Sequence, residues 1–299
     1  MNNIDVFSPT VYKRRKPEDT ILYQTVLNHL DEYIMEVGDV PHYVESAFRK
    51  YLTCGILAYG FARIRCRECG ESFLLAFSCK QRGACPSCNT KYMVMTSAHI
   101  VDNVLPRVKY RQWVLAVPKR IRYFLHKNPH HAGRVLRIFH TAIERFIRGK
   151  CMIRKKDGRI GAISFIQRFG ALINIHVHYH SIVTDGVFTE DDSGEVCFNE
   201  AKKIEEEEVV KMTGRVRKRV LSYMVKNNLL DSIDAKDMLS WEHNGGFSID
   251  CSVKIDKDDR FGLEKLVRRL SPPYRQKVVD VLIYNNPMLQ HGVRETPIL

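Results

Sequence analysis

The stretch Asn174-Ile175-His176-Val177-His178-Tyr179-His180-Ser181-Ile182-Val183-Thr184-Asp185-Gly186 decides the fold of the C-terminal part of the chain. Polar and apolar residues alternate strictly in its first half, which predicts a strand with one polar face and one buried face. The pair Asp185-Gly186 predicts a turn directly after the strand. We therefore expect a sheet in which His176, His178 and His180 share one face.

These three histidines indicate a metal site. A single histidine on a strand is usually structural, but three imidazoles on one face of an apolar strand cost desolvation unless they have a partner. Two imidazoles that are two residues apart on a strand can hold one divalent cation, and a third ligand would complete the set. Such a cation could polarise a phosphate and stabilise transition-state charge.

The rest of the chain predicts further strands and helices by hydrophobic periodicity. A helix is expected from residue 19, with a break at Gly38-Asp39-Val40-Pro41 and a second short helix after it. Further helices are expected over residues 93–105, 132–149, 204–227 and 259–270. Further strands are expected over residues 112–117, 160–169, 171–184 and 247–255.

Paired cysteines predict a structural zinc site. Cys66-x-x-Cys69 is followed after fifteen residues by Cys85-x-x-Cys88, and two such pairs can supply four thiolates in tetrahedral geometry. Cys54 and Cys79 lie nearby and either could be a ligand instead, but a single cysteine is more often a small core residue. Four-thiolate sites are closed, so we expect this Zn²⁺ to stabilise a module rather than to catalyse.

The chain has an excess of positive charge that is confined to one segment. Its formal net charge is +13, and residues 101–160 contain sixteen Lys or Arg against three Asp or Glu. Such a surplus suggests a polyanionic partner, either nucleic acid or a membrane surface. Interleaved aromatic residues favour single-stranded nucleic acid, and the expected DNA contacts are Arg111, Lys119, Arg120 and Arg122.

Composition excludes several classes of protein. Hydrophobic residues make up 44% of the 299-residue chain, which excludes wholesale disorder. The sequence contains no apolar run of membrane-spanning length and no secretory signal core. We therefore expect an intracellular protein with no membrane partner, in which nine cysteines bind metal rather than form disulfides.

Four segments together resemble one known family. YLTCGILAYGFARIRCRECG, FSCKQRGACPSC, VLPRVKYRQWVLAVP and HVHYHSIVTDGVF are similar, in this order, to the transposases of the insertion sequence 91 family. These are HUH-type rolling-circle transposases with an N-terminal zinc-binding domain. The resemblance covers about residue 18 to about residue 273 and implies a DNA-associated protein of the bacterial cytoplasm.

The resemblance also implies a mechanism. In the family, a His-hydrophobic-His pair binds Mg²⁺ or Mn²⁺, and the matching pair here is His178 and His180. His176, directly upstream, is expected to be a further metal ligand or a DNA contact. A tyrosine then attacks a phosphate of single-stranded DNA at a transposon end, which gives a 5′-phosphotyrosine and a free 3′-hydroxyl.

The sequence departs from the family at the nucleophile. The family's tyrosine lies in a helix that precedes a proline pair, and Arg269 occupies that position here. Arginine cannot replace it, because its guanidinium stays protonated. Tyr274 is the candidate nucleophile, although neither it nor Tyr284 fits the family pattern. Family members usually continue past this point, so the resemblance predicts a truncated, frameshifted or inactive copy.

The expected fold class is α+β. A helical segment (1–53) is followed by a small zinc-ribbon-like module (54–105) and an HUH-type domain (106–299) with a central antiparallel sheet flanked by helices. Two alternatives to a strand-transferring transposase remain open. One is a non-catalytic, zinc-containing DNA-binding protein, and the other is a metal-dependent nuclease that activates water.

Overall fold

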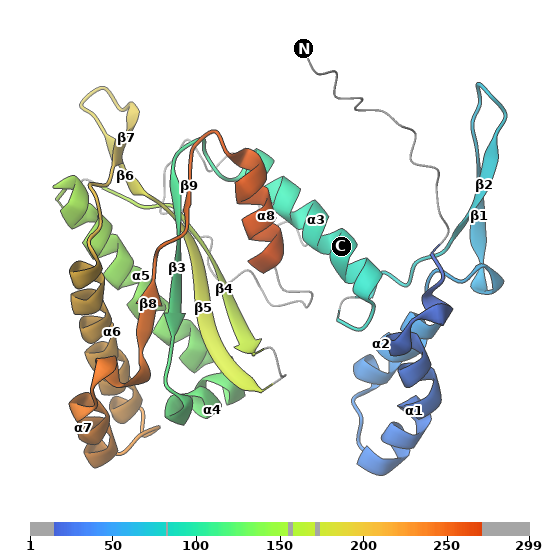
Figure 1. The fold of residues 1–299 in the computed structure, drawn as a ribbon, viewed down its shortest axis with the longest axis horizontal. Coiled ribbons are helices and arrows are strands. Elements are labelled where there is room, and N and C mark those ends of the chain that lie inside the picture. Colours follow the sequence, from blue (N-terminus) through green and yellow to red (C-terminus); the bar gives the residue numbers. More distant parts are fainter. Residues whose placement is uncertain (1–14, 82, 155–157, 171–173, 271–299) are drawn as a thin grey trace. The chain divides into compact units, whose positions relative to one another are not determined.

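The computed structural model describes residues 15–81, 83–154, 158–170 and 174–270. These residues form a mixed α+β structure, as predicted, with eight α-helices. The chain divides into two compact units whose boundary lies between Met95 and Thr96, within helix α3 (Pro86–Asn103). Each unit has its own helices and its own antiparallel strands (Figure 1).

Unit 1 contains two helices, a hairpin and the start of α3. Helix α1 (Ile21–Val37) begins after Thr20, whose hydroxyl accepts a hydrogen bond from the amide of Tyr23, and it ends at Gly38 with φ of 75°. Helix α2 (His42–Thr53) follows, so the predicted break between two helices is confirmed.

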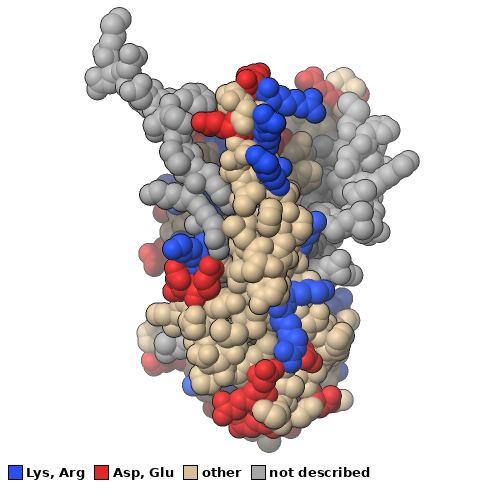
Figure 2. All heavy atoms as spheres, turned by 90° about the vertical axis from the view of Figure 1, so that its right-hand side faces the viewer, with Lys and Arg blue, Asp and Glu red and all other residues tan. Residues whose placement is uncertain are grey.

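The hairpin of unit 1 joins strands β1 (Phe61–Arg65) and β2 (Ser72–Ala76), which pair antiparallel. Its side chains are largely exposed on both faces. Figure 2, which is turned by 90° from the view of Figure 1, shows a face that is mostly uncharged through its middle, with charged side chains at its upper and lower ends and along its edges.

Unit 2 contains a five-stranded antiparallel sheet. Strands β4 (Ala162–Phe169), β5 (Ile175–Thr184) and β3 (Tyr110–Ala116) lie in that order. The next position beside β3 is filled by two short strands, β8 (Ser248–Asp250) and β9 (Lys254–Ile255), where the sequence predicts a single strand. The interruption leaves the carbonyl of Cys251 free to accept a hydrogen bond from Arg111 at 3.0 Å.

Helices cover both faces of this sheet. One face packs against α4 (Lys119–Lys127), α5 (Pro129–Cys151), α6 (Glu206–Lys226) and α7 (Ser232–Ser240). The other face packs against α8 (Arg260–Leu270) and the end of α3. Strand β6 (Gly186–Glu190) begins after the predicted turn at Asp185 and forms a second hairpin with β7 (Val196–Glu200).

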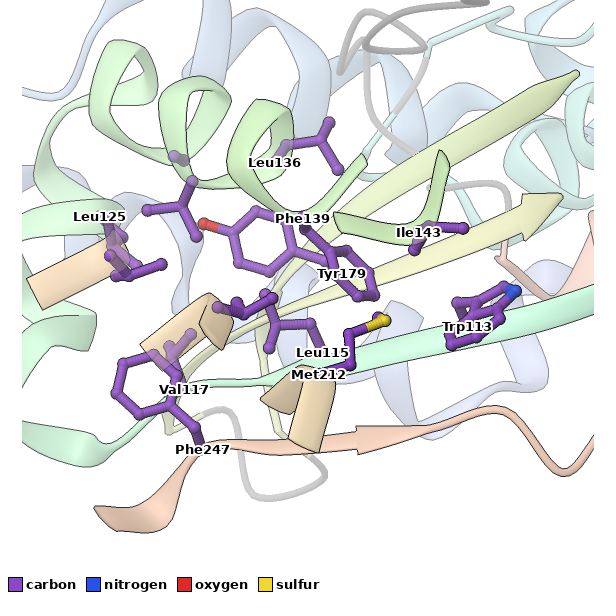
Figure 3. Packing of buried hydrophobic residues seen from close by; sticks show 14 of the residues in the cluster. Trp113, Leu115, Val117, Leu125, Leu136, Phe139, Ile143, Tyr179, Met212 and Phe247 are labelled. Carbon is purple, nitrogen blue, oxygen red and sulfur yellow. The ribbon is translucent and has the colours of Figure 1, made fainter. Parts of the chain in front are cut away.

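Strand alternation divides the core into two clusters. The larger one lies between the sheet and α5 and α6, where Trp113, Leu115, Phe139 and Tyr179 are fully buried (Figure 3). The smaller one lies on the opposite face and includes Ile182 of β5. Because Tyr179 points to the α5 side, the histidines on either side of it point to the α8 side. Within the described residues, no helix is both long and apolar enough to cross a membrane.

Candidate metal centres and nucleic-acid interface

Four cysteine sulfurs converge in unit 1. The Sγ atoms of Cys54, Cys79, Cys85 and Cys88 all lie within 4.8 Å of one another. Cys88 Sγ is 3.8 Å from that of Cys54 and 3.6 Å from that of Cys79. Four sulfurs in tetrahedral coordination at about 2.3 Å from a zinc ion are separated by about 3.8 Å. The cluster therefore has the spacing of a structural zinc site.

Local structure explains why these four cysteines meet. Cys54 ends α2, and Cys88 lies in the first turn of α3. The amide of Gly55 donates to the carbonyl of Phe77 at 2.9 Å, which holds Cys54 beside Cys79 at the base of the hairpin. The pKa of Cys85 is lowered to about 5, chiefly by its hydrogen bond with Cys54, and thiolates are the form that binds zinc.

The structure does not bring Cys66 and Cys69 to this cluster. Both are exposed and lie in the turn that connects β1 to β2, away from the hairpin base. The predicted set of four therefore shares only Cys85 and Cys88 with the converging set. The repeated spacing favours Cys66 and Cys69, whereas Cys54 and Cys79 each stand alone in the sequence and give no such signal. Cys54 and Cys79 are 25 residues apart in the sequence, and the pairing of β1 with β2 between them brings them together.

The three histidines of β5 lie side by side on the sheet face that carries α8. The ring centroids of His176 and His178 are 4.9 Å apart, and those of His178 and His180 are also 4.9 Å apart. They do not converge on one point. Among the described residues, the cysteine cluster is the one group of three or more His, Cys, Asp or Glu whose ligand atoms meet closely.

Two glutamines flank these histidines on neighbouring strands. His178 Nε2 is 3.0 Å from Gln167 Oε1 of β4, and His180 Nδ1 is 2.9 Å from Gln112 Nε2 of β3. The terminal amide of a glutamine can be turned over so that its oxygen and nitrogen exchange places, and either glutamine can therefore present its oxygen to a metal. Neither glutamine is predicted as a site residue from the sequence. The sequence feature that could have indicated them is a polar residue within a predicted strand that is otherwise largely apolar.

The local environment favours the neutral form of His176 and His180. The pKa of His180 is lowered to about 4, first by burial and then by the charges of His178 and Arg269. The pKa of His176 is lowered by burial and by the charge of Arg122. Neutral imidazole is the form that binds metal. His178 and His180, with an amide oxygen from Gln112 or Gln167, thus offer two imidazole nitrogens and one oxygen as possible metal ligands.

The four predicted DNA contacts have different environments. Arg111 is 4% exposed, and its guanidinium pairs with the Asp185 carboxylate at 2.9 and 2.7 Å, so this position does not fit the prediction. Arg120 pairs with Asp234 of α7 at 2.6 Å. Arg122 lies near His176 and donates to the carbonyl of Val117 at 2.8 Å. Lys119 is exposed.

The predicted catalytic residue Tyr274 lies outside the described residues. Helix α8, which the sequence aligns with the family's tyrosine helix, is described. Its Arg269 is close enough to His180 to lower the pKa of that imidazole. The side chain at position 269 is therefore a cation whose charge acts on His180, rather than a phenol.

Comparisons with known proteins identify the two parts of the chain. The family model described as "Transposase zinc-binding domain" matches residues 25–117, and the one described as "Putative transposase" matches residues 161–276. No curated protein and no solved structure matches the chain. The first match contains the cysteine cluster, and the second contains the histidine strand and α8. The chain is thus a DNA-binding transposase with a structural zinc module, and it belongs to the insertion sequence 91 family.

Proposed function

We propose that this transposase acts on single-stranded DNA by a rolling-circle mechanism, with the histidine strand as its catalytic metal site. The observation that carries the proposal is the row of His178, His180 and their flanking glutamines on the sheet face that also carries α8. A site for metal-assisted phosphoryl transfer combines a metal, a phosphate contact and a nucleophile.

His178 and His180 are the proposed protein ligands of Mg²⁺ or Mn²⁺, and Gln112 is the proposed third ligand. Gln112 is preferred to Gln167 because it lies beside His180, whose pKa is lowered by burial so that its neutral, metal-binding form is favoured. The metal would supply Lewis-acid stabilisation of the charge that develops on the scissile phosphate. The sheet holds the imidazoles in place, because β5 is paired with a neighbouring strand on both sides.

The proposed path of the DNA strand passes the end of α4. Arg122 lies near His176 and can contact a phosphate. Tyr123, the next residue, has an exposed ring with the Lys127 ammonium 5.8 Å from its centroid. Exposed aromatic rings beside cations are typical of single-strand binding, because bases stack on them.

The nucleophile is the part of the mechanism in which this chain differs from its family. A tyrosine oxygen would bond to the phosphorus, displace the 3′-oxygen and leave a 5′-phosphotyrosine, from which the free 3′-hydroxyl could later rejoin a strand. Arg269 cannot perform this step, because its guanidinium stays protonated. Cleavage therefore requires a hydroxyl from outside α8, and we propose Tyr274, which follows Leu270 by four residues.

Covalent capture tests this function. The full chain is incubated with Mn²⁺ and a single-stranded oligonucleotide that carries either a 5′ or a 3′ label. A 5′-phosphotyrosine transfers only the 3′-labelled fragment to the protein, in an adduct that survives detergent. Tyr274→Phe should abolish the adduct, whereas Tyr284→Phe, the matched control, should leave it unchanged.

The other outcomes separate the alternatives. Cleavage without an adduct would indicate a nuclease that activates water, and retention of DNA without cleavage would indicate a binding protein. The double variant His178→Ala/His180→Ala should lose Mn²⁺ binding in a titration while its zinc content stays unchanged. An unchanged Mn²⁺ titration would place the cation elsewhere.

A further inference from the structure

A second basic surface lies on the side of unit 2 opposite the histidine strand. Helices α5 and α6 lie side by side and antiparallel there (Figure 1). Lys150 and Glu208 join one pair of ends at 2.8 Å, and His131 Nδ1 and the Tyr223 hydroxyl join the other at 2.7 Å. Their buried faces fill the larger core cluster, so their outer faces form a continuous surface.

The outer faces of both helices are strongly cationic. The exposed cations recur mostly at intervals of three or four residues, which places them along one stripe of each helix. We name them the back-face cations: Arg134, Arg137 and Arg145 of α5, and Lys211, Arg215, Lys218 and Arg219 of α6.

Acidic residues do not neutralise this surface. From Val209 to Lys226, α6 contains no Asp or Glu, and the single acid of α5, Glu144, pairs with Arg148. Within the part of the chain that the structure describes, none of the back-face cations is in an ion pair. By contrast, Arg111 and Arg120 of the same unit are paired. A merely solvated helix face usually mixes both signs of charge.

The surface lacks features that would suit a single strand or a membrane. Tyr223, the one aromatic residue of α6, is only partly exposed and its hydroxyl is bonded to His131. The one exposed large apolar residue on either helix is Val210. Single strands need exposed rings on which bases stack, and membrane-surface helices need an exposed apolar face.

We infer that the back-face cations bind the phosphate backbone of duplex DNA. At about 1.5 Å per residue, the stripe from Arg134 to Arg145 is about 17 Å long, roughly half a turn of B-DNA. Packed helices lie about 8–10 Å apart, so the two stripes have a separation comparable to the groove widths of about 6 and 12 Å. The inference goes beyond the proposed function and does not depend on the histidine site.

Salt-dependent binding of a blunt duplex tests the inference in the full chain. The test variant is Arg137→Gln/Arg215→Gln/Arg219→Gln, and the matched control is Lys236→Gln/Lys254→Gln/Lys257→Gln, which removes the same charge from exposed positions elsewhere in unit 2. Each lost phosphate contact reduces the slope of log K against log salt by about 0.9. The slope of log K against log salt should become shallower by about 2–3 in the test variant, and by less than about 1 in the control.

A tailed substrate and the histidine variant separate this surface from the proposed active site. Wild type should bind a single strand joined to a duplex more tightly than it binds the single strand alone. The test variant should bind both substrates with the same affinity, which equals the affinity of wild type for the single strand. His178→Ala/His180→Ala should retain blunt-duplex binding. The inference is wrong if the test variant and the control have equal slopes, or if the test variant loses binding to anionic vesicles but not to the duplex.

Discussion

Replacing Cys54 by serine should remove the structural zinc ion and unfold unit 1, although Cys54 belongs to no Cys-x-x-Cys pair. Its sulfur lies 3.6 Å from that of Cys85 and 3.8 Å from that of Cys88, and its side chain is 3% exposed. A serine hydroxyl is a poor zinc ligand, because it does not ionise near neutral pH. The site would keep three thiolates and lose its closed coordination.

The size of the effect follows from the small core of unit 1. Its buried cluster consists of Tyr23, Tyr51 and three of the four cysteines. Burying two aromatic side chains stabilises a fold by about 3–6 kcal/mol, whereas structural zinc contributes roughly 10–16 kcal/mol in small zinc domains. Zinc binding therefore contributes more than these two aromatic side chains do, and unit 1 should unfold without the metal.

Metal analysis and limited proteolysis provide the measurement. Wild type should contain zinc, Cys54→Ser and Cys79→Ser should contain almost none, and proteolysis of both should remove unit 1 while unit 2 remains. Cys66→Ser and the unit 2 control Cys197→Ser should retain the cluster zinc. If Cys66→Ser loses all zinc and Cys54→Ser keeps it, the geometric assignment is refuted and the set predicted from the sequence is correct.

Three further outcomes are expected in unit 2. Arg111→Ala should destabilise the fold by about 3–5 kcal/mol in denaturant unfolding, because it leaves the mostly enclosed Asp185 carboxylate, 12% exposed, without its partner; a loss below about 1 kcal/mol would contradict this. The pKa of His140 is about 4 in the folded protein, lowered by burial, so its contribution to stability is present above pH 6.5 and is lost as the pH falls towards 4. Unfolding free energy should drop by roughly 3 kcal/mol over that range, and His140→Leu should flatten the profile. Arg122→Ala should weaken binding of a single strand more than Arg120→Ala, as measured by fluorescence anisotropy, because Arg120 is already paired; equal losses would remove Arg122 from the DNA path.

Local sequence pattern predicts the parts of the fold in which a short segment carries its own information. The alternation around His178 predicts both the strand and its polar face, and the observed register confirms that arrangement. The helix predicted over residues 204–227 is likewise confirmed as α6, at whose start Glu205 and Glu208 form a capping box. These features depend on residues within a few positions of one another, which are visible in a sequence.

Contacts between distant residues are not predictable in the same way. Gln112 and Gln167 meet the histidines only because β3 and β4 pair with β5 in one particular register. The basic segment that contains Arg111 predicts a DNA contact there, but the partner of this arginine, Asp185, is 74 residues away, and no spacing rule connects them. The sequence therefore predicts the polarity of a position, whereas the pairing register determines its partner.

The proposed metal ligands lie on the sheet and position 269 lies on a helix, so the side chain at position 269 can change without altering the sheet. The imidazoles of His178 and His180 belong to a central strand, so strand pairing fixes them whatever α8 contains. Helix α8 is anchored by Leu263 and Val267, which are buried in the smaller core cluster, whereas Arg269 is exposed. An exchange between tyrosine and arginine at position 269 therefore leaves the packing of α8 intact and changes an exposed side chain whose charge acts on His180. On the proposed function, such a change removes the attacking hydroxyl but preserves the metal ligands and both DNA surfaces. A copy altered in this way would still bind DNA, and only a hydroxyl from another segment could restore cleavage.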